Sequence, residues 1–341
     1  MQTRRRVPFP LAVMALAVLV SMLLAACGSS ASTPTTASTP GSTNNKPLID
    51  VSIGLGYIPD IQFAPFYVAL SKGYYKAAGL NVTLNHGVVT DLFGEMMSNK
   101  DTFVFATGDE TLVARSKNLP VVDVSTLYQR YPVSLIVPAS SPIKTLADFK
   151  GHTIGEPGPF GSTHIGVLAL LHQAGLSTSD VTLKSIGFTQ VSALKQGRVD
   201  AVVGYTNNEP LQLKRLGMQV RTFDVSDYQP LISNGIVTTE STLHDQNLNV
   251  VQPFVQATLK GLQDVIANPA EALQIGKSYI PGMKTDVAMD ELQATIPIWK
   301  GSGQHALGYN DSAVWQTMAQ FLAGQKLIPA NLDVSKAFVN A

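Results

Sequence analysis

Apolar residues along the chain recur at two spacings, and the spacing changes from one segment to the next. Between residues 51 and 223, short β-branched apolar runs alternate with segments in which apolar side chains recur every three or four positions. The first pattern is typical of buried strands and the second of amphipathic helices. Strands that alternate with helices indicate an α/β fold in which helices cover the faces of a parallel sheet.

The expected elements form two series followed by a helical tail. Strands are predicted at residues 51–55, 80–84, 102–106 and 121–125, and again at 133–137, 153–155, 180–185, 201–205 and 220–223. Helices are predicted at residues 62–73, 92–98, 108–118, 145–151, 191–195 and 211–216, with a further helix that ends at residue 174. In the tail, helices are expected at residues 250–268, 269–279, 286–296 and 311–323. We expect the tail to pack back on the first series.

The segment Leu127–Val137 joins the two series. It reads LYQRYPVSLIV, with two tyrosines and an arginine before an apolar β-branched run. Pro132 lacks an N–H and keeps the residue before it out of the helical region, so the chain passes in extended form from one element to the next. We interpret this segment as a crossover between two lobes, and an edge strand with surface tyrosines is the alternative. Ile232–Thr238 is the expected return crossover.

These two crossovers define the predicted domains. The first lobe is expected to comprise residues 47–132 and 238–341, and the second lobe residues 133–237. A cleft between the lobes would collect the carboxyl ends of the parallel strands, which is where ligands bind in open α/β sheets.

Residues 1–27 have the layout of an export signal. Three arginines at positions 4–6 precede an apolar stretch, and small residues precede Cys27, the sole cysteine of the chain. A signal peptide shows this order of charged, apolar and small residues, although an apolar stretch of this length is also compatible with a transmembrane helix. Cys27 resembles the lipidated residue of a bacterial lipobox, whose acyl chains would anchor the protein to the membrane. Residues 28–46 are rich in Ser, Thr, Pro and Gly, which predicts a disordered linker.

Composition narrows the class of partner. The 24 basic residues balance the 24 acidic ones, and charged residues make up only 14% of the chain. Soluble proteins average roughly 25% charged residues, so the body is weakly charged and suits an uncharged or weakly charged small ligand. No basic patch is present in the sequence, which argues against nucleic acid as a partner.

The sequence offers no pattern typical of a metal, a cofactor or a catalytic nucleophile. The six histidines, at positions 86, 152, 164, 172, 244 and 305, are not paired at metal-ligand spacing. The chain contains neither a G-x-S-x-G elbow nor, apart from Cys27, a cysteine. We therefore expect no metal, no cofactor and no catalytic residue.

Aromatic and polar residues gather where the predicted strands end. Tyr57 and Tyr131 are the first choice for stacking on a flat ligand, with Tyr128, Phe160 and Tyr205 as alternates. Core packing or a surface position is the alternative for each ring. Further candidates at the same ends are Asp60, Gln62, Phe63 and Glu110. Helix capping is the alternative for the acidic ones.

Two loops of the second series could hold the polar edge of a ligand. Asn207, Asn208 and Glu209 follow an apolar strand, and a carboxylate or amide can pair with the hydrogen-bonding groups of a ligand. They also fit a capped helix start. The other loop contains Gly158, Phe160, Gly161 and Ser162. Its glycines would let the backbone approach a ligand, and the following helix start would offer free N–H groups to an oxygen or phosphate.

Several of these segments together resemble one family. Gly56–Ala69 reads GYIPDIQFAPFYVA, and Lys72–Tyr75 and Gly79–Leu80 follow it. The chain in this region resembles the thiamine-pyrimidine-precursor family, which includes bacterial substrate-binding proteins of ABC transporters and fungal pyrimidine synthases. The segments YQRYP at 128–132, GFTQ at 187–190 and GYTNNEP at 204–210 are similar to the bacterial proteins that bind hydroxymethylpyrimidine or formylaminopyrimidine. The similarity covers about residues 51–262. Asp60 departs from it, since relatives often carry Asn there.

The resemblance implies a type II periplasmic-binding-protein fold and a role in transport. The expected protein is a monomer on the extracytoplasmic face of the cell membrane, held by the lipid on Cys27. It would close on a pyrimidine ligand by hinge motion and deliver it to an ABC permease with a cytoplasmic ATPase. In related proteins the loop at 158–162 contacts the ligand. A sulfonate or another heterocycle is the alternative ligand.

Catalysis is the alternative from another class. The fungal synthases carry a cysteine-rich iron-binding run together with a lysine and a histidine for their cofactor. This chain has no second cysteine, and the corresponding helix entrance reads Ala106-Thr107-Gly108-Asp109-Glu110. We therefore expect a binding protein and not an enzyme.

Overall fold

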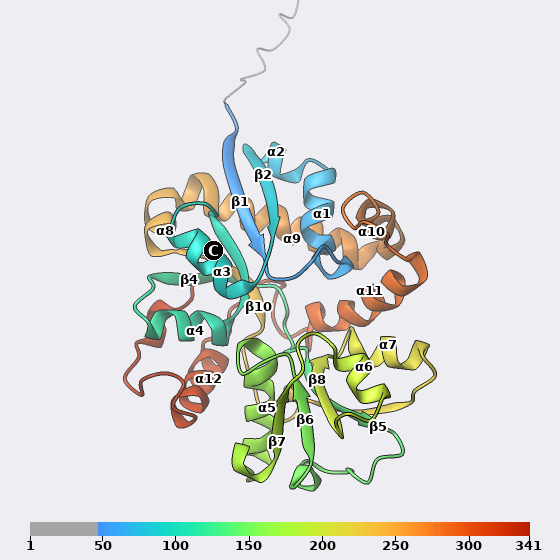
Figure 1. Ribbon diagram of the computed structural model, residues 1–341. Coiled ribbons are helices and arrows are strands. Elements are labelled where there is room, and N and C mark those ends of the chain that lie inside the picture. The colour runs from blue at the N-terminus through green and yellow to red at the C-terminus, as the bar shows by residue number, and fades with distance from the viewer. Residues whose placement is uncertain (1–46) are drawn as a thin grey trace, which may run out of the picture. The chain divides into compact units, whose positions relative to one another are not determined.

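The computed structural model describes residues 47–341, and Cys27, the predicted signal and the predicted linker lie outside the described residues. The described body contains two five-stranded sheets, with strand orders β2-β1-β3-β10-β4 and β7-β6-β8-β5-β9. Each sheet is covered by helices, and the chain passes between the sheets twice (Figure 1).

The first sheet is built from both ends of the described chain. Its strands are β1 (Ile49–Leu55), β2 (Leu80–His86), β3 (Phe103–Thr107), β4 (Val121–Thr126) and β10 (Asn234–Thr239). Strand β1 pairs in parallel with β2 and β3. Strand β10 lies between β3 and β4 and runs antiparallel to both.

The second sheet repeats this arrangement. Its strands are β5 (Val133–Pro138), β6 (Thr153–Glu156), β7 (Thr182–Ser185), β8 (Ala201–Tyr205) and β9 (Val220–Asp224). Strand β6 is parallel to β7 and β8, whereas β5 is antiparallel to β8 and β9. The sheets are thus parallel, as the alternation of strands and helices predicts, except at β5 and β10. A helical crossover makes successive strands parallel, and these two strands enter from the other lobe without one.

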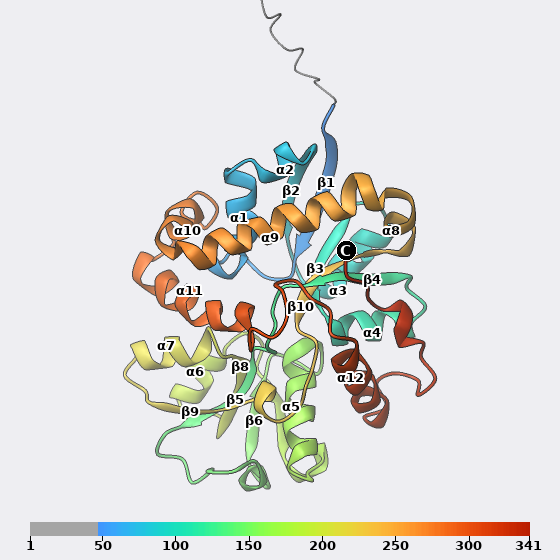
Figure 2. The same cartoon turned by 180° about the vertical axis from the view of Figure 1, so that it is seen from behind.

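Helices of the first lobe include those that close its core. They are α1 (Ala64–Ser71), α2 (Tyr74–Ala77), α3 (Val89–Met97), α4 (Gly108–Ser116), α8 (Glu240–Gln246), α9 (Gln252–Ala267), α10 (Pro269–Gly276) and α11 (Thr285–Lys300). Helix α9 crosses the first lobe and lies in front of β1 and β3 in the view of Figure 2. Its Phe254 stacks on Phe103 with ring centroids 4.2 Å apart, and Trp299 of α11 lies in the same buried cluster. Helices α9 to α11 thus pack on the first lobe, as expected.

The last helix, α12 (Ser312–Gly324), behaves differently. Its buried Trp315 and Met318 belong to a cluster that also contains Leu112 of α4 and Val133 and Ile165 of the second lobe. Helix α12 thus packs on α4 of the first lobe, as expected of the tail, and it also reaches the second lobe. The apolar face of α12 joins the two lobes, because Leu112 of the first lobe and Val133 and Ile165 of the second lobe belong to the same buried cluster.

The second lobe has shorter helices. They are α5 (Gly161–Gln173), α6 (Gln190–Lys195) and α7 (Glu209–Arg215). The helix predicted at 145–151 is a single 3-10 turn, Leu146–Phe149, capped by Thr145. Asp91 directly precedes the helix predicted at residues 92–98 and would cap it, but α3 begins at Val89 and Asp91 lies inside its first turn.

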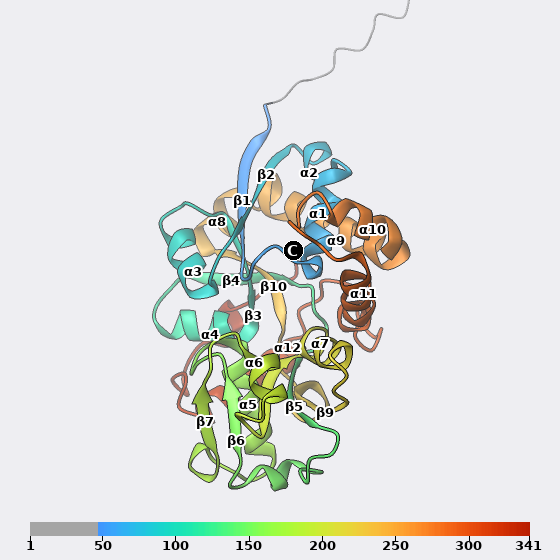
Figure 3. The ribbon, with the colours of Figure 1, turned by 45° about the vertical axis from the view of Figure 1, so that its right-hand side comes forward.

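The two crossovers lie against each other. The N–H groups of Leu127 and Tyr128 both donate to the carbonyl of Asn234, at 2.9 and 3.0 Å. Strand β10 runs between β3 and β4 from Asn234 onward (Figure 3). Residues 234–237, expected in the second lobe, thus pair with the first sheet.

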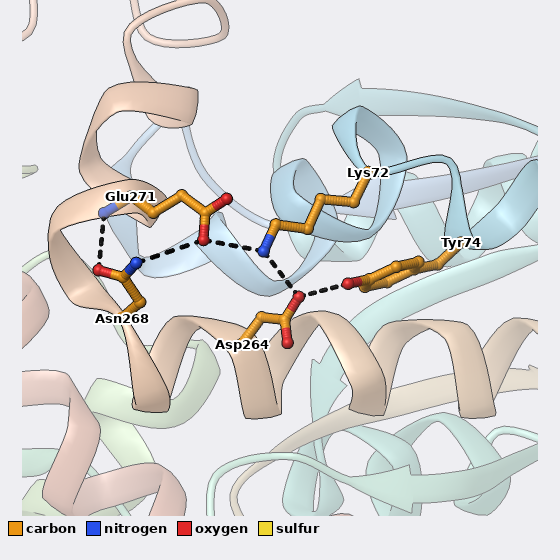
Figure 4. A network of polar contacts seen from close by, with 5 residues as sticks. All are labelled: Lys72, Tyr74, Asp264, Asn268 and Glu271. Atoms are coloured by element: carbon orange, nitrogen blue, oxygen red, sulfur yellow. Dashed lines mark hydrogen bonds and ion pairs between the residues drawn. The ribbon is translucent and has the colours of Figure 1, made fainter.

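A polar network outside the cleft joins three helices of the first lobe (Figure 4). Lys72, which follows α1, donates to Asp264 of α9 and to Glu271 of α10, at 2.9 Å each. The Tyr74 hydroxyl donates to the same Asp264 carboxylate at 2.5 Å, and Asn268 accepts from the Glu271 N–H. The network thus connects α9 and α10 to α2 and to the end of α1. Among the described helices, none has the length and apolar content needed to cross a bilayer.

Candidate ligand cleft

A cleft of about 930 Å³ opens between the two sheets. Ligand clefts in proteins have volumes of roughly 300–1,000 Å³, so this one has room for a ligand at the large end of that range. Its walls come from both lobes. The lining residues used below are Gly56, Tyr57, Ile58, Asp60, Gln62, Phe63, His86, Val88, Val89, Phe105, Glu110, Phe160, Gly161, Ser162, Thr163, Phe188, Thr189, Gln190, Lys195, Tyr205, Asn207, Asn208, Glu209 and Glu291.

The turn after β1 forms one wall of the cleft, and its backbone is tightly packed. A Cβ on Gly56 would lie 2.1 Å from the Val89 Cγ2, so only glycine allows α3 to approach this closely. Asp60 follows and caps the short 3-10 helix Ile61–Phe63, accepting from the Gln62 N–H at 3.0 Å. The turn thus presents Tyr57, Asp60 and Phe63 to the cleft, which are three of the residues predicted from the sequence.

Aromatic rings line the cleft from both lobes. Phe63 and Tyr57 come from the first lobe and Tyr205 and Phe160 from the second. The Phe160 side chain is 49% exposed, and Phe188 on the same lobe is 70% exposed. Exposed rings at the mouth of a cleft are free to pack on the flat face of a ligand.

Four carboxyl groups, which we call the cleft carboxyls, line the same space from four elements: Asp60, Glu110, Glu209 and Glu291. Glu209 starts α7 and accepts from the Tyr205 N–H at 2.7 Å. Glu110 forms the capping box of α4 and accepts from the Thr107 N–H at 2.9 Å. Glu209 and Glu110 thus have structural roles and also line the cleft.

Burial changes the ionisation of the cleft carboxyls. Burial raises the pKa of Asp60, although the N–H groups of Gln62 and Ile61 act in the opposite direction. Burial likewise raises the pKa of Glu209 to about 7. Burial, followed by the charge of Asp60, raises the pKa of Glu291 to about 8. Removal from water disfavours the charged form of a carboxyl, so these groups would gain from a ligand that donates hydrogen bonds to them.

The two asparagines of the 207–208 pair do different things. Asn207 is only 4% exposed, and its Nδ2 donates to the Thr295 hydroxyl of α11 at 2.8 Å, across the two lobes. Its Oδ1 has no hydrogen-bond partner within residues 47–341. Asn208 Oδ1 accepts from the Gln212 side chain at 2.5 Å within α7. Asn207 therefore offers an acceptor at the cleft that a ligand could satisfy.

Tyr131, the first choice for stacking together with Tyr57, does not line the cleft. Its side chain is buried, and its hydroxyl lies 2.9 Å from Asp109 Oδ1 and 3.1 Å from the Ser162 carbonyl. Tyr128 is also buried and packs edge-on against Trp299. Both rings lie in cores on either side of the crossover, Tyr128 in the cluster with Trp299 and Tyr131 in the cluster with Val133. The structure thus corrects their expected placement.

The loop before α5 is only partly as predicted. Phe160, Gly161 and Ser162 line the cleft, but Gly158 does not. A Cβ on Gly158 would lie 2.3 Å from the Phe160 ring, so this glycine makes room for the ring. Gly161, with φ of 71°, has the left-handed conformation that glycine favours.

Several lining residues were not predicted. His86 lies in the cleft because β2 continues two residues past its predicted end. Its Nδ1 is 2.9 Å from the Tyr57 carbonyl, and burial lowers its pKa. Glu291 comes from α11, in the helical tail that the sequence linked to no chemistry. A strand prediction extended by two residues would have suggested His86, whereas no local sequence signal marks Glu291.

No group of three or more metal-binding side chains occurs within the described part of the chain. The cleft carboxyls come from separate elements.

Comparisons with known proteins agree with this arrangement. The family model described as NMT1/THI5 like matches residues 60–272. The chain is 37% identical to the riboflavin-binding protein RibY of Chloroflexus aurantiacus, over 97% of each chain. It is 28% identical to the formylaminopyrimidine-binding protein of Halalkalibacterium halodurans, over 75% of this chain and 77% of that one. It is 24% identical to a 4-amino-5-hydroxymethyl-2-methylpyrimidine phosphate synthase of Legionella pneumophila, over 85% and 91%.

Among solved structures, the chain is similar to the periplasmic aliphatic sulphonate binding protein SsuA from Escherichia coli. The TM-score is 0.69 at 16% identity, over 85% of this chain and 92% of that one. At this identity the likeness concerns the fold, which is the two-lobed periplasmic-binding-protein fold expected from the sequence.

Proposed function

The chain belongs to the NMT1/THI5-like family, and we propose that within it the protein is the substrate-binding component of an ABC importer for a flat, nitrogen-rich heterocycle. The observation that carries this proposal is the cleft of about 930 Å³, lined by aromatic rings and carboxyl groups from both lobes. A ligand that contacts both lobes binds the closed form better and shifts the population toward it.

A flavin is the ligand that the cleft fits best. A single pyrimidine ring would fill a small part of this volume, whereas a tricyclic ring with a polyol chain would fill much more of it. The exposed rings of Phe160 and Phe188 suit the apolar side of such a ring system. The cleft carboxyls suit the hydroxyl and ring N–H donors of its polar side. The 37% identity to a riboflavin-binding protein supports this choice.

A thiamine pyrimidine precursor, hydroxymethylpyrimidine or formylaminopyrimidine, is the second candidate. It is favoured by Glu209 and Asn207, which present acceptors suited to a ring N–H and an exocyclic amine. The likeness to a formylaminopyrimidine-binding protein supports it as well.

Transport also requires a location and a partner. The lipid anchor proposed at Cys27 would hold the protein at the extracytoplasmic face of the membrane, and the linker at residues 28–46 would let the body reach its permease. A monomer would suffice, because one chain supplies both walls of the cleft.

Catalysis is the rival proposal, since several relatives are named as synthases. Residues 106–110 contain neither lysine nor histidine, and the sole cysteine is Cys27. The riboflavin-binding relative is 37% identical over 97% of this chain, whereas the relatives named as synthases are 24–29% identical. We therefore favour binding without turnover.

The proposal is tested by calorimetric titration of the full-length chain in detergent with riboflavin, hydroxymethylpyrimidine and formylaminopyrimidine. We expect saturable one-site binding of riboflavin and weaker binding of the pyrimidines. Tight binding of a pyrimidine alone would identify the second candidate, and conversion of any of these compounds would favour catalysis. If none of the three rings binds, the proposal is wrong.

Replacement of Glu209 by alanine tests the polar side of the cleft. Loss of a charged hydrogen-bond partner should weaken ligand binding by about 2–3 kcal/mol. The control is Glu95→Ala, whose carboxylate pairs with Lys100 away from the cleft. Unchanged calorimetric affinity in Glu209→Ala, in protein that melts as the parent does, would remove this carboxyl from the site.

A further inference from the structure

The ionisable groups of the cleft are strongly unequal in sign. Four carboxyls line it, and Lys195 is the one lysine or arginine that does so within residues 47–341. Lys195 lies on the short helix α6, and its Nζ is 3.4 Å from the Leu216 carbonyl. None of the cleft carboxyls forms a salt bridge with another described residue. No cation of the described chain therefore neutralises the charge of any cleft carboxyl that is ionised.

The neutral groups add acceptors to this lining. Asn207 is buried, and its Oδ1 lacks a partner among the described residues because its Nδ2 is committed to Thr295. His86 faces the Tyr57 carbonyl through Nδ1, which must carry the proton to donate there, so Nε2 is left as an acceptor. A ligand with many donors satisfies such a surface, whereas an anion offers only further acceptors.

One place in the cleft would normally suit an anion, and a carboxyl of the protein already lies against it. Helix α5 begins at Gly161, and its first-turn residues Ser162 and Thr163 line the cleft. The free N–H groups at such a helix start attract phosphate and sulfonate. A Cβ at Gly161 would lie 3.5 Å from Glu110 Oε1, so the Glu110 carboxyl lies directly against this helix start.

The backbone amide of Ser162 interacts with the Glu110 carboxyl. Burial raises the pKa of Glu110, and the backbone amide of Ser162 acts in the opposite direction. The sequence pattern predicted free N–H groups here for an oxygen or phosphate of the ligand. In the structure Glu110, from the other lobe, lies where that oxygen would bind.

We propose that the cleft discriminates against anions, so that the protein binds the unphosphorylated form of its heterocyclic ligand and rejects the phosphate monoester. This inference rests on the proposed function only in taking the ligand to be a heterocycle with a hydroxyl-bearing arm. It applies equally to a flavin and to a hydroxymethylpyrimidine, because both become anions when the hydroxyl is phosphorylated.

The selectivity assigns the protein a place in a reaction sequence. Where the heterocycle is present outside the cell as its phosphate ester, a phosphomonoester hydrolysis must therefore precede uptake. In that step water attacks phosphorus, the bond from phosphorus to the ester oxygen breaks, and the free alcohol and inorganic phosphate leave. The alcohol is the form that this cleft accepts.

The test compares matched pairs on the full-length chain by calorimetry: riboflavin with its 5′-phosphate, and hydroxymethylpyrimidine with its phosphate. We expect the affinity of each phosphate to be lower than that of its alcohol by a factor of roughly 100 or more, because like charges that face each other at an interface are strongly penalised. Equal or tighter binding of either phosphate overturns the inference.

Two variants locate the discrimination. Glu110→Gln removes the charge at the start of α5 and should reduce the alcohol-to-phosphate ratio at least tenfold, mainly by improving phosphate binding. Asp245→Asn removes an exposed carboxylate of α8 outside the cleft and should leave the ratio unchanged. A ratio that falls equally in both variants, or in neither, overturns the assignment to Glu110.

A last measurement keeps this inference separate from the proposed function. The melting temperature of the full-length chain is recorded with phenyl phosphate and with hexanesulfonate, which carry the anion but not the heterocycle. Neither should stabilise the parent, and stabilisation by either one overturns anion exclusion. If no heterocycle binds but these anions also fail to stabilise, the proposed function fails while the selectivity stands.

Discussion

At the scale of single residues, the molecule holds carboxyl groups where water is scarce. Asp60, Glu209 and Glu291 share one cleft, and each has a raised pKa for which burial is the first cause. A few N–H groups offset this burial for Asp60 and Glu209, whereas no hydrogen bond to the Glu291 carboxyl is found in the described chain. A ligand with donors would complete the missing contacts.

Glu291 should therefore make the ligand-free protein less stable as the pH rises. Its pKa is raised from 4.5 to about 8 in the folded protein, so the folded state holds this proton more tightly than the unfolded state. The contribution is present below about pH 4.5 and is lost as the pH rises toward 8. The melting temperature between pH 5 and 8 should fall less steeply in Glu291→Gln than in the parent. Glu95→Gln is the control, and the same slope in all three proteins would contradict this account.

Tyr131 is a second residue whose role follows from its contacts. Its hydroxyl is the donor nearest to the buried Asp109 carboxyl, whose Oδ2 has no partner within residues 47–341. Tyr131→Phe should lower the free energy of unfolding by about 1–3 kcal/mol, since it leaves buried acceptors unsatisfied. Tyr279→Phe, which removes an exposed bond to Ser71, is the matched control. A large loss of ligand affinity with unchanged urea unfolding would instead return Tyr131 to the ligand wall.

At the scale of elements, helices α7 and α11 make the most direct polar link between the lobes. Arg215 of α7 donates to the Asp286 carboxylate at 2.7 Å, to the Asp286 carbonyl at 2.6 Å and to the Asp290 carboxylate at 2.6 Å. Glu291, on the same helix α11, faces the cleft. Movement of α11 relative to α7 would thus change the ion pairs and the cleft lining together.

Arg215→Ala should weaken ligand binding by favouring the open form. Exposed ion pairs contribute roughly 0.2–1 kcal/mol each, so we expect a loss of affinity of about two- to tenfold. The parent's affinity should also fall with added salt more than that of the variant. Lys214→Ala, one residue earlier on α7, is the control, because no salt bridge of Lys214 occurs in the described chain. Equal affinities and equal salt dependence would show that the ion pairs do not affect closure.

At the scale of the whole described body, the two lobes make apolar contacts on one side of the cleft and polar contacts on the other. The cluster that includes Trp315, Met318, Val133 and Ile165 spans both lobes beside α4, α5 and α12. On the other side, exposed ion pairs connect α7 to α11. A second hollow of about 460 Å³ lies between these two helices. Opening should therefore separate α7 from α11 and leave the apolar side closed.

Spin labels would measure this motion. Labels at Leu211 and Gln293, which face each other across that second hollow, should approach when ligand is added. Labels at Asp245 and Lys277, both in the first lobe, should keep their separation. The labels require Cys27→Ser, since Cys27 is the sole native cysteine. If the first pair does not move with saturating ligand, binding does not proceed by hinge closure.

The sequence by itself determined the two series of strands, the crossovers and most of the residues at the strand ends. Alternating apolar spacing and Pro132 act locally, and residues at the carboxyl ends of neighbouring strands must share one edge of a sheet. Tyr57, Asp60, Tyr205 and Glu209 were found for this reason. The family resemblance added a ligand class that no spacing contains.

Only the tertiary structure decided which of those side chains face the ligand. Tyr131 and Tyr57 have similar local patterns, yet one is in the core and the other in the cleft, because burial depends on what packs from elsewhere in the chain. Glu291 enters the cleft, and Glu110 meets the start of α5, through packing between segments far apart in sequence. Such contacts depend on the relative placement of whole elements, which a local pattern of apolar and polar residues does not specify.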